Sequence, residues 1–131
     1  MTSAEKPRLR CSLIVTIYNQ ARQLALLLES TVNQTEPSFE IIVADDGSHD
    51  DPRAVVETFA AQNPGRKVLY LSQDDQGFRK AMMQNEAVRH AGTDYLVFVD
   101  GDMILHPRFV ELHLERARPG DVLCGYRGIK L

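Results

Sequence analysis

The chain has 131 residues, of which 44% are hydrophobic and 25% are charged, and its formal net charge is −3. These values predict one globular domain with a buried core, and they exclude a general electrostatic attraction to nucleic acid or to an anionic membrane. No apolar run approaches the roughly 18 residues of a membrane span, and no signal-peptide core follows residues 1–10. We therefore expect a cytoplasmic protein without a transmembrane segment, in which Cys11 and Cys124 are reduced and buried.

Apolar runs and helical patterns alternate along the chain after residues 1–10, which we expect to be a flexible lead-in. The apolar runs predict strands at residues 12–18, 39–44, 68–71, 95–100 and 122–124. The helical patterns between them begin near residues 20, 52, 79 and 107. This alternation predicts an α/β fold, with a mostly parallel, doubly wound sheet and helices on both faces. We expect the run at 95–100 to be a buried central strand.

Residues with strong local preferences mark several of the predicted boundaries. Asn19 is expected to cap the first helix, and Asp51 is expected to cap the second, which has Pro52 at its first position. Gly47 suits a turn that requires a positive φ angle. Asn85 is expected on the apolar face of the third helix.

Acidic residues collect where the predicted strands end. Asp45 and Asp46 follow the second strand, and residues 74–75 and 100–102 follow the third and fourth. The carboxyl ends of parallel strands share one edge of the sheet, and open α/β sheets bind their ligands there. The position of these acids is therefore evidence for a ligand site.

The two acids of the fourth cluster have a spacing that suits a metal ion. If the backbone stays extended past Val99, Asp100 and Asp102 point to the same face, roughly 6.5–7 Å apart at their Cα atoms. Two carboxylates at that separation can share a divalent cation. Gly101 between them has no side chain, which would let a ligand approach closely.

The same acids can bind an anionic ligand only with help from cations. Repulsion between a carboxylate and a phosphate about 4 Å apart is on the order of 4 kcal/mol at an effective dielectric constant of 20. Mg²⁺ or Mn²⁺ commonly bridges carboxylates to phosphate oxygens. Arg79 and Lys80, at a helix start, would add positive charge. The acidic cluster therefore predicts a divalent metal ion and a phosphate-bearing ligand such as a nucleoside diphosphate.

Three motifs occur in a fixed order along the chain. They are Asp45-Asp46-Gly47-Ser48 with Asp50, Gly77-Phe78-Arg79 leading to Asn85, and Asp100-Gly101-Asp102. This ordered set, which spans roughly residues 11–125, resembles the motif series of inverting family 2 glycosyltransferases, especially bacterial polysaccharide- or glycan-synthesising members. The resemblance implies a GT-A fold and transfer of a sugar from a nucleotide sugar, UDP-linked, to a glycan or other acceptor with Mn²⁺ or Mg²⁺.

The resemblance also implies which residues form the nucleotide site. They are Thr16, Ile17, Tyr18, Asp45, Asp46, Arg79, Asn85 and Asp100. In this scheme Asp45 hydrogen-bonds a uracil ring, and Asp46 supports its loop or the ribose. Asp100 faces both the ribose and the metal ion, and Asp102 ligates the metal ion directly.

Two departures from the family pattern limit what the resemblance implies. Many relatives have Arg where this chain has Gln84, and no residue after Asp102 is identifiable as the catalytic base, since Glu111 and Glu115 lie on the following helix. We therefore expect residues 11–131 to be a nucleotide-sugar-binding domain that lacks the acceptor-binding half. Two alternatives stay open: a non-catalytic nucleotide-binding or assembly module, and a phosphatase of the haloacid-dehalogenase type, for which Asp100 comes late in the chain.

Overall fold

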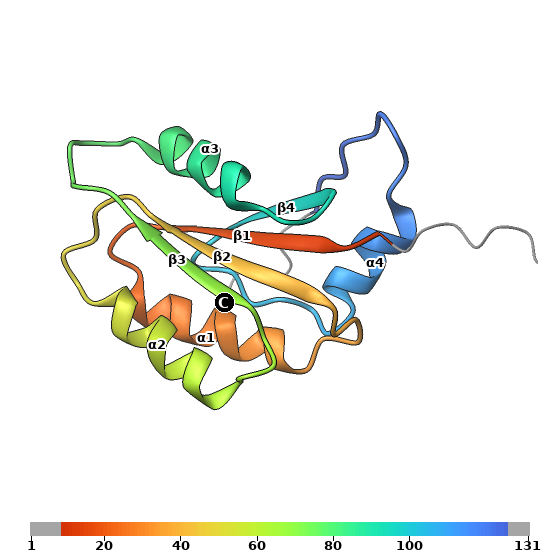
Figure 1. Ribbon diagram of the computed structural model, residues 1–131, viewed down its shortest axis with the longest axis horizontal. Coiled ribbons are helices and arrows are strands. Elements are labelled where there is room, and N and C mark those ends of the chain that lie inside the picture. Colours follow the sequence, from red (N-terminus) through yellow and green to blue (C-terminus); the bar gives the residue numbers. More distant parts are fainter. Residues whose placement is uncertain (1–8, 126–131) are drawn as a thin grey trace, which may run out of the picture.

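The computed structural model describes residues 9–125, which form one parallel sheet with helices on both faces (Figure 1). The strands are β1 (Cys11–Ile17), β2 (Phe39–Asp45), β3 (Val68–Ser72) and β4 (Tyr95–Asp100). They lie in the order β3-β2-β1-β4, so β1 and β2 are the central pair. Most of the predicted lead-in and the end of the predicted domain, residues 1–8 and 126–131, lie outside the described residues.

The helices divide unequally between the two faces of the sheet (Figure 1). α1 (Ala21–Val32), α2 (Pro52–Gln62) and α4 (Phe109–Arg116) pack on one face, and α3 (Lys80–His90) packs on the other. The predicted α/β fold with a doubly wound parallel sheet is therefore confirmed. Within residues 9–125, we find no helix with the length and hydropathy that a membrane crossing requires.

Alternation along the central strands gives the core two parts. Leu13 and Val15 of β1 face α1 and α2, and neither has any exposed surface. Ile14 faces the opposite way, toward Met83 and Ala87 of α3. Because both faces are covered, every residue of β1 and β2 is buried, as interior parallel strands require.

Two predictions about the strands are wrong. β4 is an edge of the described sheet and not a central strand, and its Phe98 is 48% exposed. The predicted strand at residues 122–124 does not form, because this short apolar run pairs with no strand in the described part of the chain, and Val122 is 88% exposed. For the same reason Cys124 is exposed, whereas Cys11 is buried as expected.

The first two helices begin at acidic side chains of one loop. Asp51 caps α2 as predicted, since its side chain accepts a hydrogen bond from the Ala54 backbone N–H at 3.1 Å. Asn19 does not cap α1, because it adopts a left-handed conformation with φ of 52°. Instead Asp50 reaches across from the β2–α2 loop and accepts from the Ala21 N–H at 2.9 Å. The start of α1 therefore depends on a contact between loops.

Candidate functional site

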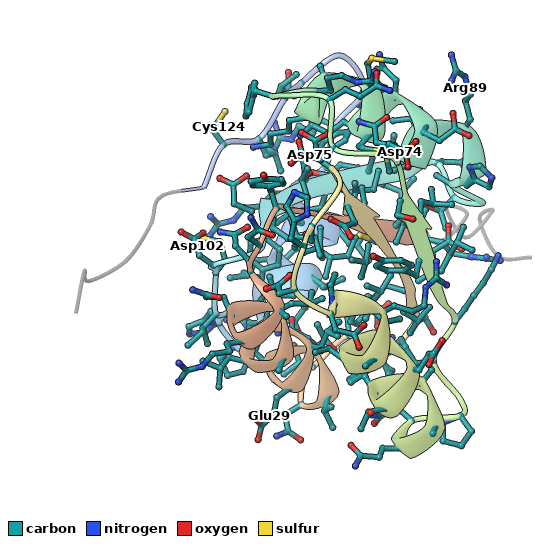
Figure 2. The ribbon with its side chains drawn as sticks, turned by 90° about the vertical axis from the view of Figure 1, so that its left-hand side faces the viewer. Glu29, Asp74, Asp75, Arg89, Asp102 and Cys124 are labelled. Atoms are coloured by element: carbon teal, nitrogen blue, oxygen red, sulfur yellow. The ribbon has the colours of Figure 1, made fainter. Side chains whose placement is uncertain are left out.

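Three loops at the carboxyl end of the sheet are held together by one acidic side chain. Asp75, in the β3–α3 loop, accepts a hydrogen bond from the Tyr18 hydroxyl at 2.8 Å, and the same oxygen lies 2.6 Å from Nε2 of His49. The contact with His49 and the bond from Tyr18 lower the pKa of Asp75, and the same bond raises the pKa of Tyr18. The loops after β1, β2 and β3 therefore form a continuous rim, and Figure 2 looks toward this end of the molecule.

The two acids at the end of β2 are buried and bonded within the protein. Asp45 is 2% exposed, and its carboxylate accepts hydrogen bonds from the backbone N–H of Ser48 at 2.9 Å, from the Ser48 hydroxyl at 2.5 Å and from the Tyr70 hydroxyl. Asp46 is 4% exposed and accepts from Nε2 of Gln73 at 2.7 Å and from the backbone N–H at the start of α3 at 2.8 Å. Both carboxylates therefore fix the shape of the rim.

Gly47 allows two of the loops to approach each other. Its φ angle is 91°, positive as predicted. A Cβ atom at this position would lie 2.5 Å from the backbone nitrogen of Asp75. Both the conformation and the space therefore require glycine here.

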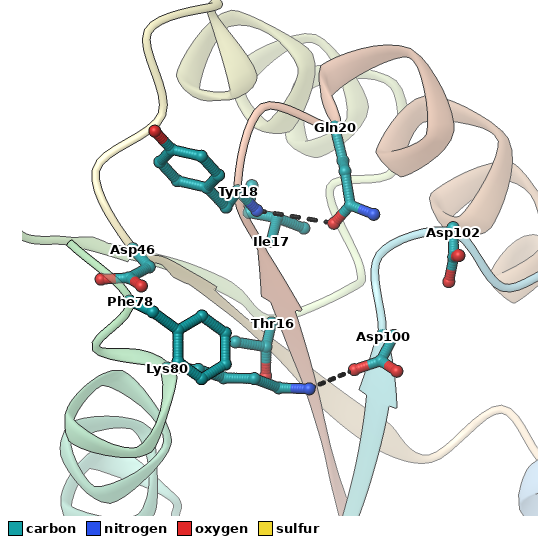
Figure 3. A pocket seen from close by; sticks show the side chains of 9 residues that line it. All are labelled: Thr16, Ile17, Tyr18, Gln20, Asp46, Phe78, Lys80, Asp100 and Asp102. Atoms are coloured by element: carbon teal, nitrogen blue, oxygen red, sulfur yellow. Dashed lines mark hydrogen bonds and ion pairs between the residues drawn. The ribbon is translucent and has the colours of Figure 1, made fainter. Parts of the chain in front are cut away.

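Asp100 and Asp102 lie on a tight turn. β4 ends at Asp100, and the Met103 N–H donates to the Asp100 carbonyl at 3.2 Å. The predicted extended spacing is therefore wrong, although the turn still presents both carboxylates to one pocket (Figure 3). A Cβ atom at Gly101 would overlap the Ile17 side chain, so this glycine serves close packing against β1 and not the approach of a ligand.

The rim and the turn enclose a pocket of about 280 Å³. Figure 3 shows Asp100 and Asp102 on one side of it and Asp46 with Phe78 on the other. The Lys80 side chain extends between them, and its Nζ lies 2.6 Å from Oδ1 of Asp100. The lining residues are Thr16, Ile17, Tyr18, Gln20, Asp46, Phe78, Lys80, Asp100 and Asp102.

The structure brings most of the predicted site residues together around this pocket, but it turns three of them elsewhere. Asp45 faces inward, as described above. The guanidinium of Arg79 contacts Gln76 at 2.5 Å and Gln73 at 3.2 Å within its own loop and does not line the pocket. Asn85 does not line it either.

The position of Asn85 follows from the rotation of α3 about its axis. The buried face of α3 carries Met83 and Ala87, whereas Asn85 is exposed, so the prediction of an apolar-face Asn85 is wrong. Gln84 points toward the sheet instead, and its Nε2 lies 3.5 Å from the Thr16 hydroxyl. Gln84, at the position where many relatives have Arg, is thus the polar residue of this helix that reaches the end of β1.

Three lining residues were not among the predicted site residues. Lys80 had a signal in the sequence, because it begins the helix that follows the Gly77-Phe78-Arg79 motif. Phe78 is 90% exposed beside the pocket, and Gln20 lines it from the β1–α1 loop. The positions of these two depend on loop conformation, which no hydrophobic period indicates.

The ligand set of the pocket fits a hard divalent cation that shares its coordination with a bound phosphate. Asp100 and Asp102 supply carboxylate oxygens, which suit Mg²⁺ and Mn²⁺. Within residues 9–125, no group of three or more His, Cys, Asp or Glu side chains is placed to hold a metal ion by itself. Mg²⁺ usually binds through one or two carboxylates together with waters and substrate phosphates, so the pocket suits an ion that arrives with its ligand.

The later glutamates do not reach this pocket. Glu111 lies 2.5 Å from Nε of Arg108, and Glu115 lies 3.8 Å from the same guanidinium, both at α4. Neither lines the pocket, and the catalytic base stays unassigned.

Comparisons with known proteins agree with this geometry. Chondroitin synthase of Escherichia coli is 32% identical over 105 residues, which are 79% of this chain and 15% of that protein. Staphylococcus aureus TarS 1–349 in complex with UDP matches with a TM-score of 0.67 and 27% identity, over 81% of this chain and 31% of that one. The mannosyltransferase PcManGT from Pyrobaculum calidifontis, in complex with GDP-Man and Mn²⁺, matches with a TM-score of 0.66 and 28% identity, over 72% of this chain and 28% of that one.

The chain therefore spans less than a third of the length of each of these proteins. Its parallel sheet with helices on both faces is the nucleotide-binding arrangement of GT-A glycosyltransferases. The model of the family described as glycosyl transferase family 2 matches residues 12–130, which include all the residues that line the pocket. The chain belongs to glycosyl transferase family 2.

Proposed function

We propose that this chain binds the nucleotide-sugar donor of a glycosyltransferase together with Mn²⁺ or Mg²⁺, and that the donor is UDP-linked. The observation that carries the proposal is the meeting of Asp46, Asp100, Asp102 and the start of α3 around one pocket. UDP in the TarS 1–349 complex and GDP-Man with Mn²⁺ in the PcManGT complex support it. The sugar would pass to a glycan or another acceptor.

The rim would hold the nucleoside. Thr16, Ile17 and Tyr18 would border the base, and Asp46 would support its loop or the ribose. A carboxylate has about four acceptor sites, and the Ser48 and Tyr70 bonds occupy three of those on Asp45. A hydrogen bond from a uracil ring to Asp45 would use the remaining site. Arg79 and Asn85 would need to turn toward the pocket to contact the nucleotide.

The turn would hold the diphosphate end of the donor. Asp102 and Asp100 would ligate the metal ion, which when bound supplies Lewis-acid stabilisation of the departing nucleoside diphosphate. The backbone N–H groups and the dipole of the first turn of α3 favour negative charge at the same place. Phe78 and Tyr18, both exposed at the pocket, would exclude water from the bound donor.

Two further points belong to the proposal. A cytoplasmic location is supported by the unpaired thiols of Cys11 and Cys124. Membership of the family replaces the phosphatase alternative. Sugar transfer by this chain alone would exclude the alternative of a non-catalytic nucleotide-binding module.

Isothermal titration calorimetry with UDP tests the proposal. We expect the protein to bind UDP in the presence of Mn²⁺, to lose binding in EDTA, and to lose at least about tenfold in affinity in Asp102→Asn. Asp94→Asn, a change of another exposed acid outside the pocket lining, is the matched control and should bind as the wild type does. UDP binding that needs no metal, or that survives Asp102→Asn, would contradict the proposal, and tighter binding of GDP would correct the base.

A further inference from the structure

The ion pair between Lys80 and Asp100 places a protein cation where the proposed function requires a metal ion. Lys80 is the first residue of α3, Asp100 is the last residue of β4, and their charged atoms lie 2.6 Å apart (Figure 3). Both side chains are partly exposed, at 33% and 45%, so the contact can open without unpacking the core.

Lys80 and a divalent ion would compete for the same carboxylate. The ammonium group donates to Oδ1 of Asp100. A metal ion on that carboxylate would face the ammonium at short range, and two cations repel strongly at such a distance in a partly buried site. Binding of the ion by Asp100 and Asp102 together therefore favours a conformation in which Lys80 has moved away.

A bound diphosphate would give Lys80 a new partner inside the pocket. Lys80 is the one cationic side chain among the described lining residues, and both oxygens of Asp46 already accept bonds from Gln73 and the Arg79 backbone. The four-carbon stem of lysine rotates freely, and its ammonium can donate to phosphate oxygens. The start of α3, where Lys80 lies, is also where backbone N–H groups favour an anion.

We propose that Lys80 exchanges partners on donor binding: it neutralises Asp100 while the pocket holds no donor, and it moves to a diphosphate oxygen when donor and metal ion bind together. The inference rests on the proposed function. Its consequence is that the metal ion binds weakly alone and tightly with the nucleoside diphosphate. Such a positive coupling between two ligands is reciprocal, so each should raise the affinity for the other.

Lys80→Met separates the two halves of the exchange. Binding of Mn²⁺ without nucleotide would be followed by the electron paramagnetic resonance signal of free Mn²⁺, and binding of UDP at saturating Mn²⁺ by calorimetry. We expect the variant to bind Mn²⁺ alone about threefold more tightly, because a competing cation is gone, and UDP about tenfold more weakly, because a charge-assisted contact is lost. Arg89→Met removes a positive charge from the same helix, where Arg89 pairs with Glu86 at 2.9 Å, and should change neither affinity.

The opposite signs of the two effects distinguish the exchange from a merely structural role, since a poorly folded variant would lose both affinities. Either change without the other, or no change in a folded Lys80→Met, would overturn the inference. Failure of the proposed function has a different signature, because the wild-type protein would then not bind UDP with Mn²⁺ at all.

Discussion

The acids at the end of β2 and the acids at the end of β4 belong to the same rim but have different surroundings. Asp45 and Asp46 are 2% and 4% exposed, and their oxygens accept hydrogen bonds from the protein. The Asp100 side chain is 45% exposed and contacts a movable ammonium, and Asp102 is exposed on the turn. The comparison teaches that the neighbours of an acid, and not its place in a motif, decide whether it shapes a loop or binds a cation.

Asp45→Ala should produce the largest effect and would break the comparison if it did not. Removal of this carboxylate leaves the donors of Ser48 and Tyr70 without their acceptor in a buried place, so we expect a loss of about 3 kcal/mol in the free energy of unfolding. Asp102→Ala, at the exposed acid, should change it by less than about 0.5 kcal/mol. Urea denaturation measures both, and equal losses in the two variants would show that the acids do not differ in this way.

Gly101→Ala should have the next largest effect. The added Cβ would overlap the Ile17 side chain, and overpacking of this kind costs about 2 kcal/mol in the free energy of unfolding. Gly65→Ala is the control, because no heavy atom lies within 4 Å of a Cβ at that position. The shifted turn should also weaken Mn²⁺-dependent UDP binding. Wild-type stability in Gly101→Ala would contradict the close packing of the turn against β1.

Glu40 extends the comparison to the opposite end of β2, with a smaller effect. Burial raises its pKa, but hydrogen bonds from Ser12 at 2.6 Å and the Gly92 N–H at 2.7 Å, with Lys67 at 3.1 Å, lower it below the ordinary value of 4.5. A carboxyl whose pKa is lower in the folded state contributes stability above its unfolded pKa and loses it as the pH falls through the folded pKa.

We therefore expect Glu40→Gln to reduce the decline in stability below pH 4.5, measured by urea denaturation across the acid range. Its loss at neutral pH should be smaller than that of Gly101→Ala. Glu57→Gln, at an exposed position of α2, should keep the wild-type pH profile. An unchanged profile in Glu40→Gln would show that this buried network does not carry the acid sensitivity.

The strands and helices could be predicted because their signals are local. The continuous apolar run from Leu13 to Ile17 and the Asp51-Pro52 start of α2 depend on neighbouring residues alone. The edge position of β4 could not be predicted in this way, because it depends on which strands lie beside it. The run at 122–124 failed for a related reason, since an apolar triplet forms a strand only when a partner pairs with it.

The meeting of the acidic loops could also be predicted, since parallel strands bring their carboxyl ends to one edge. The direction of the side chains on α3 could not. The sequence offers Ala81, Met82, Met83, Ala87 and Val88 as apolar positions, and only the packing of Met83 and Ala87 on the sheet decides the rotation of the helix. That rotation turns Lys80 and Gln84 toward the sheet and leaves Asn85 outside.

A crystal structure with UDP and Mn²⁺, with the anomalous signal of manganese recorded, tests the central claim most directly. The account predicts a manganese peak at bonding distance from the Asp102 carboxylate and the diphosphate, with the uracil against the rim and Lys80 turned from Asp100 to a phosphate oxygen. A manganese ion bound away from Asp100 and Asp102, or UDP bound outside this pocket, would contradict it.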